Sequence, residues 1–371
     1  MNLINQDKIK ETIKLLLLKE APLLLKEIDF NHKDAFLEPL LFTFFNYKTE
    51  EKWSSELLTE FMQGYFLKNQ NLQINSSHYL NNIAYLPYLG YFTEDNPELF
   101  EQIHIIENTS IEILKYPIYF HNNIFRNKQN QIINRKEIIV TNSLFQKNIS
   151  YLTNAINLIK ENSPKYFGLI NQCCKKIVLF KTNPANTNSF ATIKAHGIAF
   201  INVYQDDYDE VFFVDDIAHQ AGHIILTTLF FDKKKIFKIN EEHKVEEITN
   251  QKDHRTINTL LHALYTYYTT ILCLDNCLKN KVFNNKQKKE SIARIGFYLN
   301  KCNIDLERFE QINVFFKGIE NVLNSDGIKF YLFIKENLLI FSENWLPTIS
   351  TFNYSNQPYN FTFEHFNKLN H

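Results

Sequence analysis

The residues HQAGH, at positions 219–223, place two histidines four residues apart. In a helix this spacing puts both imidazole rings on one face, where they can hold one metal ion. His219 and His223 are therefore predicted to be metal ligands. Asp215 lies one turn earlier and is expected to accept the second ring N–H of a ligating histidine. The alternative is that two histidines merely share a helix face.

A second stretch that could carry metal chemistry is DHRTINTLLHALYTYY, residues 253–268. Arg255, Thr259 and His262 follow one another at i, i+4 and i+7, which predicts that they share one face of a helix. His262 would then complete a set of three ligands that leaves metal positions open for chemistry. The alternatives are a buried His262 satisfied by a tyrosine or the backbone, and an ordinary surface arginine at position 255.

Gln220 argues against a zinc peptidase. In HExxH peptidases the glutamate takes a proton from metal-bound water, which an amide cannot do near neutral pH. Leu229 stands where a metzincin would carry its third histidine. Glu246 and Glu247 could imitate a downstream glutamate ligand, but they lie in a charged stretch where solvated carboxylates are expected. Peptide hydrolysis is disfavoured, whereas metal binding is not.

The chain resembles the HExxH-motif peptide-modification proteins of ribosomal peptide natural-product pathways. The resemblance rests on HQAGH and on the arginine and histidine of the later stretch DHRTINTLLHALYTYY. The family's second motif reads roughly R-P-L-x-x-x-x-H-x-x-Y. The resemblance covers about residues 175–270. His219 and His223 match the two motif histidines, and His262 and Arg255 match the histidine and arginine of the second motif. The chain departs from the pattern at Gln220, Thr256 and Ile257.

The resemblance implies iron(II)- and 2-oxoglutarate-dependent hydroxylation of a side-chain carbon in a precursor peptide. Three protein ligands would leave two metal positions for the keto acid and one for O2. Arg255 is expected to pair with the distal carboxylate of 2-oxoglutarate, with the Thr259 hydroxyl as a second contact. An oxygenase needs no general base at position 220, so the role of Gln220 at the catalytic site is open. A carboxylate ligand is also possible, from Asp215, Asp216 or Glu246.

The elements expected to position these residues are mainly helices, because only 8 glycines and 9 prolines interrupt the chain. Apolar residues recur at helical spacing in six segments: 7–29, 144–161, 211–231, 256–280, 286–300 and 304–324. Strands are expected at 175–182 and 196–204. The predicted fold is α+β and predominantly helical, with a small sheet beside a zincin-like metal-binding helix. Its predicted parts are a mostly helical region, 1–140, and a metal-site region, 141–371.

The strand at 196–204 precedes the HQAGH helix, in the order found in zincin-type enzymes, where such a strand edges the substrate cleft. Its free edge could pair with an extended peptide. The alternative is an internal strand paired on both sides.

Gly222 lies between the two motif histidines and suggests either close approach by a substrate or tight packing. His196 and Tyr265 are further residues that could line a pocket.

The composition narrows the class of protein. Lysine and arginine (40) nearly balance aspartate and glutamate (41), which gives no overall basic character for nucleic-acid binding. No apolar run reaches the length of a membrane span, and the N-terminus lacks the pattern of a signal peptide. The five cysteines do not resemble a disulfide framework and are expected to be buried and free in a reducing cytoplasm. The sequence does not indicate an oligomeric state.

Three functions follow from these observations. The first is an iron(II)- and 2-oxoglutarate-dependent oxygenase acting on a ribosomally made precursor peptide. The second is a non-catalytic scaffold that holds a peptide on a degenerate zincin-like core. The third is a zinc hydrolase that uses another base.

Overall fold

The computed structural model describes residues 5–68, 72–95, 99–127, 129–355, 357 and 360–370. The chain divides into two units, of which the first contains residues 1–150 and 169–207. The second contains residues 151–168 and 208–371. The division passes through helices α4 (Asn142–Asn162) and α5 (Pro164–Cys173).

These units differ from the predicted division between residues 140 and 141. The strands expected near 175–204 belong to the first unit, because β5 (Glu112–Leu114) pairs in parallel with β6 (Lys176–Phe180). That pairing joins segments that are far apart in the sequence. The region 1–140 is also less helical than predicted, since it contributes five strands to two sheets.

The larger sheet of the first unit has the order β4-β5-β6-β8-β7. Its central strands β5, β6 and β8 (Ile198–Asn202) run parallel, and its edge strands pair antiparallel. The edge strands are β4 (His104–Ile105) and β7 (Phe190–Ala191). Every residue of β6 and β8 is buried, which explains why their sequences are apolar runs without alternation.

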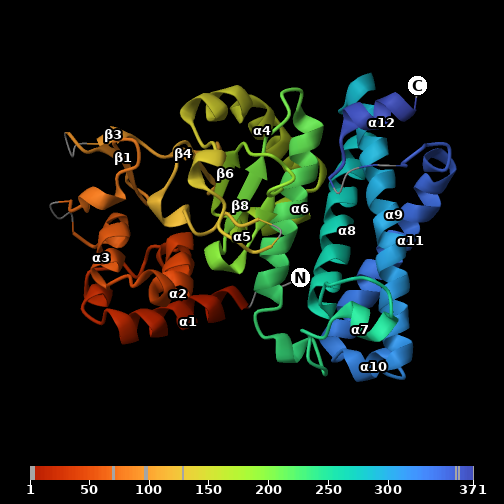
Figure 1. The fold of residues 1–371 in the computed structure, drawn as a ribbon, viewed down its shortest axis with the longest axis horizontal. Helices are drawn as coiled ribbons and strands as arrows, with labels where there is room; N and C mark the ends of the chain where they lie inside the picture. Colours follow the sequence, from red (N-terminus) through yellow and green to blue (C-terminus); the bar gives the residue numbers. More distant parts are fainter. Residues whose placement is uncertain are drawn as a thin grey trace. The chain divides into compact units, whose positions relative to one another are not determined.

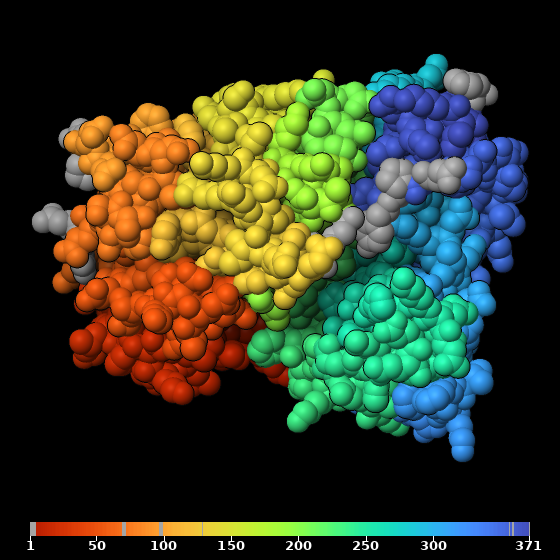
Figure 2. Space-filling model, viewed as in Figure 1, coloured from red at the N-terminus to blue at the C-terminus, as the bar shows by residue number. Residues whose placement is uncertain are grey.

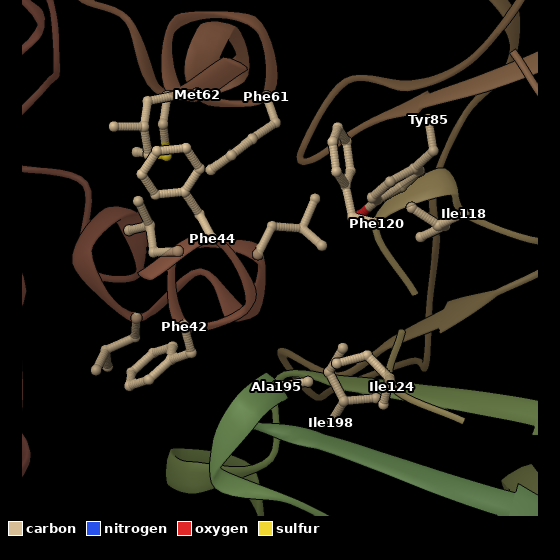
Figure 3. Packing of buried hydrophobic residues seen from close by; sticks show 14 of the residues in the cluster. Phe42, Phe44, Phe61, Met62, Tyr85, Ile118, Phe120, Ile124, Ala195 and Ile198 are labelled. Atoms are coloured by element: carbon tan, nitrogen blue, oxygen red, sulfur yellow. The ribbon is translucent and has the colours of Figure 1, made fainter. Parts of the chain in front are cut away.

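Besides parts of α4 and α5 and several 3-10 helices, the described part of the first unit contains three α-helices and a small antiparallel sheet. These elements are α1 (Asn5–Glu20), α2 (Pro39–Glu51), α3 (Glu56–Met62), β1 (Ile83–Leu86), β2 (Gly90–Thr93) and β3 (Leu99–Glu101). Aromatic rings fill much of the core between helices and sheet. Figure 3 shows Phe44 and Phe61 near Phe120, and Ile198 of β8 closing the cluster on the sheet side.

The second unit is built almost entirely from helices. Figure 1 shows α6, α8 and α9 side by side, with α11 packed against α8 and α9. Its helices from α6 onward are α6 (Glu210–Leu229), α7 (Val245–Thr249), α8 (Ile257–Lys279), α9 (Asn285–Phe315), α10 (Ile319–Val322), α11 (Ser325–Ile349) and α12 (Phe363–Leu369). Among the described residues, no helix combines the length and the apolarity needed to cross a membrane.

Local sequence explains where the two helices of the predicted metal site begin. The Asp209 carboxylate caps α6 by accepting the backbone N–H of Val211 at 3.0 Å. The Thr256 hydroxyl caps α8 by accepting the backbone N–H of Thr259 at 3.2 Å. Such caps satisfy N–H groups that have no partner within the helix. The predicted ranges 211–231 and 256–280 agree with α6 and α8 to within two residues.

The charged segment between α6 and α8, in which solvated carboxylates were expected, is mostly exposed or half-buried. Residues 231–256 cover part of the visible face of the second unit in Figure 2, beside the end of α9. The segment is held by isolated backbone bridges, Phe237 to Leu323 and Lys244 to Thr256. It contains the short helix α7.

Candidate metal site

The three predicted ligand histidines lie next to one another in the second unit. The ring centroids of His219 and His223 are 5.1 Å apart, and those of His223 and His262 are 5.9 Å apart. His219 and His223 come from α6, and His262 comes from the first half of α8. The rings are neighbours in pairs, but within the described chain no three histidine, cysteine or carboxylate side chains surround one common point closely enough to hold a metal.

Gly222 allows α6 to approach α8 closely. A Cβ atom at this position would lie 2.9 Å from Thr269 Oγ1 and 3.2 Å from Thr266 Cγ2. The Thr269 hydroxyl also donates to the carbonyl of Ala218 at 3.2 Å, which ties the two helices together at this point. The glycine is therefore required by helix packing rather than by a substrate. The same close packing brings His262 beside the α6 histidines.

All three histidines are held in their neutral form. Burial lowers the pKa of His223 to about 4 and that of His262 to about 3. The pKa of His219 lies well below its usual value, first because of burial and then because of His223 and Lys301. Neutral imidazole is the form that binds a metal ion. The Nδ1 atom of His219 is buried and has no hydrogen-bond partner among the described residues.

Two tyrosines and a lysine extend the histidine cluster. The rings of Tyr267 and Tyr298 each lie 5.9 Å from the ring of His219. The Lys301 ammonium lies 5.9 Å from the centre of the Tyr267 ring and 4.2 Å from that of Phe297. Burial lowers the pKa of Lys301 to about 8, so the ammonium is still the main form at pH 7. Lys301 thus adds a positive charge near His219, while Lys233 acts on His262.

Asp215 does not take the place predicted for it beside a ligating histidine. Its two carboxylate oxygens accept hydrogen bonds from Arg294 Nη1 at 2.7 Å and from the Tyr298 hydroxyl at 2.8 Å. Arg294 also donates through Nε and Nη2 to Glu290, one turn earlier on α9. Asp215 therefore acts on the cluster through Tyr298, whose ring packs beside His219, and through its charge on Lys301.

Gln220 is buried, with 4% of its surface exposed. Its side-chain N–H donates to Asp216 Oδ1, one turn earlier on α6, at 3.1 Å. Its Oε1 atom has no hydrogen-bond partner in the described part of the chain. The Gln220 side chain lies on the buried side of α6, whereas His219 and His223 are partly exposed. A direct catalytic role for Gln220 stays a prediction.

Arg255 differs most from its predicted setting. It precedes the N-cap of α8, so it lies outside the helix and does not share a helical face with Thr259 and His262. Its guanidinium forms paired hydrogen bonds with two buried carboxylates, Asp253 at 2.7–3.2 Å and Asp305 at 2.6–2.8 Å.

Arg308 joins the same two carboxylates, at 3.0 Å from Asp253 and 3.3 Å from Asp305. Two arginines and two aspartates thus form a closed, neutral network, which we call the Arg255 network. The helix-face argument for Arg255 was wrong because it extended the helical spacing past the Thr256 cap. Thr259 itself is exposed, and its hydroxyl is 3.0 Å from that of Thr256.

The strand at 196–204 and the residues His196, Tyr265 and Glu246, which the sequence analysis singled out, are packed or paired within the protein. The strand 196–204 has no free edge along Ala199 and Phe200, since β8 pairs with β6 on one side and β7 on the other. His196 is buried in the first unit and packs on Phe42 at 5.1 Å. Tyr265 is buried in the second unit against Phe330. Glu246 pairs with His254 at 2.8 Å. Of the two alternatives for the strand at 196–204, the structure shows pairing on both sides at Ala199 and Phe200, which leaves no edge for a peptide there.

The sequence analysis missed the contributions of α9. Arg294, Tyr298 and Lys301 all come from this helix, at the spacing of one helical face. One signal was present, because the chain has five arginines and Arg294 lies four residues after Glu290 on a predicted helix. The five cysteines, by contrast, are free and buried as predicted.

No model of a known protein family matches the chain, and no curated protein matches it either.

Proposed function

We propose that the second unit binds a divalent transition metal through His219, His223 and His262 and acts as an iron(II)- and 2-oxoglutarate-dependent oxygenase. Its substrate would be a side-chain carbon of a ribosomally made precursor peptide. One observation carries the proposal: three neutral, partly exposed histidines are neighbours, and the buried Nδ1 atom of His219 has no hydrogen-bond partner among the residues that the structure describes. Three imidazoles suit iron, zinc, copper and nickel.

The three histidines fit a metal in donor type and protonation, and their rings would have to turn for all three to meet it. When bound, iron would supply activation of O2 alongside the keto acid. The chain's own part is to hold three imidazoles neutral and to set their orientation. Tyr267 and Tyr298 pack beside His219 and restrict the rotation of its ring.

The resemblance implies that Arg255 binds the distal carboxylate of 2-oxoglutarate, and the structure gives a reason to choose another cation. All the carboxylate-binding edges of the Arg255 guanidinium are occupied by Asp253 and Asp305. A keto acid could bind there only by displacing a buried aspartate, which is costly. Two lysines act on the histidines, Lys301 on His219 and Lys233 on His262, and Lys233 is paired with Glu241 and Glu242. We therefore assign the distal carboxylate of 2-oxoglutarate to Lys301.

The test is metal binding followed by keto-acid binding. The purified protein should retain about one iron per chain after anaerobic loading, and 2-oxoglutarate should then produce the weak visible absorption band of a chelated keto acid. His219→Ala and His262→Ala should each lose the metal. His254→Ala is the matched control, since this histidine belongs to the same unit, is 73% exposed and pairs only with Glu246. Retention of iron by the His262→Ala variant at wild-type affinity would remove His262 from the ligand set.

A second candidate function is a non-catalytic peptide-binding protein. The closure of the Arg255 network favours it, because the residue that resembles the family's arginine is tied into the fold. Metal-free protein that binds a precursor peptide as tightly as metal-loaded protein, with no consumption of 2-oxoglutarate, would favour this candidate over the oxygenase.

A further inference from the structure

The first unit contains a cavity that the sequence analysis did not predict. It has a volume of about 520 Å³ and lies where the start of α2 meets β5 and the start of β6. Its lining includes four acidic side chains and three lysines, together with the rings of His32, Tyr65 and Tyr88. A cavity of this volume suits a small molecule.

A buried group of charged residues forms the inner wall. The Lys176 ammonium donates to Glu112 Oε2 at 2.8 Å and to the Tyr85 hydroxyl at 2.8 Å, and it lies 3.1 Å from Glu38 Oε2. The side chains of Lys176, Glu112 and Glu38 are 5%, 6% and 1% exposed. We call Lys176, Glu38, Glu112 and Tyr85 the Lys176 cluster.

The hydrogen-bond pattern of the Lys176 cluster leaves one acceptor unused. Glu38 Oε1 accepts the backbone N–H of Leu40, and Glu38 Oε2 accepts the Tyr65 hydroxyl at 2.7 Å. Glu112 Oε2 accepts the Tyr85 hydroxyl in addition to Lys176. Glu112 Oε1 is buried and has no donor among the described residues. The Lys176 ammonium donates to Glu112 Oε2 and Tyr85 and lies beside Glu38 Oε2, so its charge is directed at other oxygens than Glu112 Oε1.

The charge of the cluster favours a cation. Two carboxylates share a single ammonium, and Lys176 stays protonated: burial lowers its pKa, but Glu112 and Glu38 raise it more. At the edge of the cavity Lys175 is already paired with Asp34 at 2.7 Å. A positively charged N–H donor at Glu112 Oε1 would satisfy the oxygen and balance the second carboxylate, which a neutral donor would not.

Aromatic rings form another part of the lining. His32 packs edge-on against Tyr65 at 4.9 Å and against Tyr88 at 4.7 Å, and the two tyrosine rings stack at 5.9 Å. Tyr88 is 53% exposed, so its ring is accessible from the solvent. Aromatic faces attract cations and also pack well against apolar groups.

We infer that this cavity binds a small molecule with a primary ammonium group next to an aromatic or apolar body, and that Glu112 Oε1 accepts a hydrogen bond from the ammonium. The inference concerns the first unit alone and does not depend on a metal in the second. Its unmet acceptor, excess carboxylate and aromatic lining all select the same ligand chemistry.

Benzylammonium chloride is a suitable probe, and benzyl alcohol is its neutral counterpart. Ligand-observed NMR on the full-length protein should show saturable binding of benzylammonium and about tenfold or weaker binding of benzyl alcohol. Glu112→Gln should weaken benzylammonium binding by about tenfold or more, since it removes the charge of the acceptor. Equal binding of the two probes would overturn the assignment of a cation.

The matched control is Glu101→Gln. Glu101 also accepts from a lysine and a tyrosine, Lys115 and Tyr116, but it does not line the cavity. This variant should bind benzylammonium like the wild type. If Glu112→Gln fails to fold, the exposed Tyr88→Ala variant decides, with an expected loss of about threefold or more. Wild-type affinity in folded Glu112→Gln, or in Tyr88→Ala, would overturn the inference.

Discussion

The histidine cluster and the arginine networks of the second unit are both built from polar side chains on α6, α8 and α9 and on the segment just before α8, but they differ in how their hydrogen-bonding groups are used. The Arg255 network and the Arg294 network, which joins Arg294 to Asp215, Glu290 and Tyr298, pair cations with carboxylates at 2.6–3.3 Å. In the histidine cluster the rings touch one another, and His219 Nδ1 has no partner within the described residues.

This difference separates groups that hold the fold from groups that are available to a ligand. A buried charge that is already paired is not stabilised further by a ligand. A buried polar atom without a partner carries a free-energy cost that a ligand can remove. The motif argument grouped Arg255 with the histidines because of sequence spacing. Their hydrogen bonds separate them, because the Arg255 guanidinium is paired with carboxylates whereas His219 Nδ1 has no partner among the described residues. Four measurable expectations follow from this difference.

The largest effect is expected for Arg294→Met. This change leaves the Asp215 and Glu290 carboxylates, with side chains 3% and 6% exposed, without their cation. Breaking a buried pair in this way costs about 3–5 kcal/mol of unfolding free energy. Urea denaturation followed by circular dichroism measures it. Arg135→Met, at an exposed arginine of the first unit, serves as the control and should change stability by less than about 0.5 kcal/mol. A similar, small loss in both variants would mean that the Arg294 network does not stabilise the fold.

Arg255→Met should destabilise the protein by about 1–3 kcal/mol, less than Arg294→Met because the Arg255 side chain is 27% exposed and partly screened. Its affinity for 2-oxoglutarate should stay unchanged in the iron-loaded protein, while Lys301→Met should weaken that affinity. Isothermal titration under anaerobic conditions compares the two. The opposite pattern, with unchanged stability and a lost keto-acid affinity in Arg255→Met, would restore the arginine to the cosubstrate site.

Acid should destabilise the second unit through its histidines. Burial holds the pKa of His223 at about 4 and that of His262 at about 3, below the value of about 6.5 in an unfolded chain. The unfolded state therefore binds more protons between these values, so stability is fully present above pH 6.5 and is lost as the pH falls towards 4. Each histidine contributes up to about 1.4 kcal/mol per pH unit.

The double variant His223→Leu, His262→Leu should flatten this decline in denaturation curves recorded from pH 7 to pH 4.5. The buried histidines of the first unit, His121 and His196, have lowered pKa values as well and contribute equally to both proteins. Identical pH slopes for the wild type and the double variant would show that the two histidines are already charged in the folded protein.

Local signals in the sequence predicted those parts of the fold that depend on near neighbours. The bounds of α6 and α8 follow from helical periodicity and from the caps Asp209 and Thr256. The expected break between 300 and 304 was wrong, since α9 runs unbroken from Asn285 to Phe315, with no proline or helix-ending glycine at that point. The sequence analysis also did not predict α11.

Long-range pairing explains most of what was missed. Strands β1 to β5 have two to four residues each, and such short strands form only against partners elsewhere in the chain. Within the site, the i,i+4 spacing predicted that His219 and His223 would be neighbours. No local pattern could reveal that Asp305, fifty residues after Arg255, occupies its guanidinium. Spacing predicts which residues share a helix face, but the partners that occupy them come from the tertiary fold.

The smallest effect on stability, and the clearest contrast, is expected for His219→Leu. Replacing a partnerless buried Nδ1 by an apolar side chain removes an unmet polar group, so the unfolding free energy should stay constant or rise by up to about 1 kcal/mol. Metal retention, measured by elemental analysis after anaerobic iron loading, should be lost in the same variant. A residue whose removal stabilises the fold while abolishing binding is kept for the ligand rather than for the fold. If His219→Leu instead loses as much stability as Arg294→Met, His219 is a packing residue, and the histidine cluster belongs with the arginine networks as part of the scaffold.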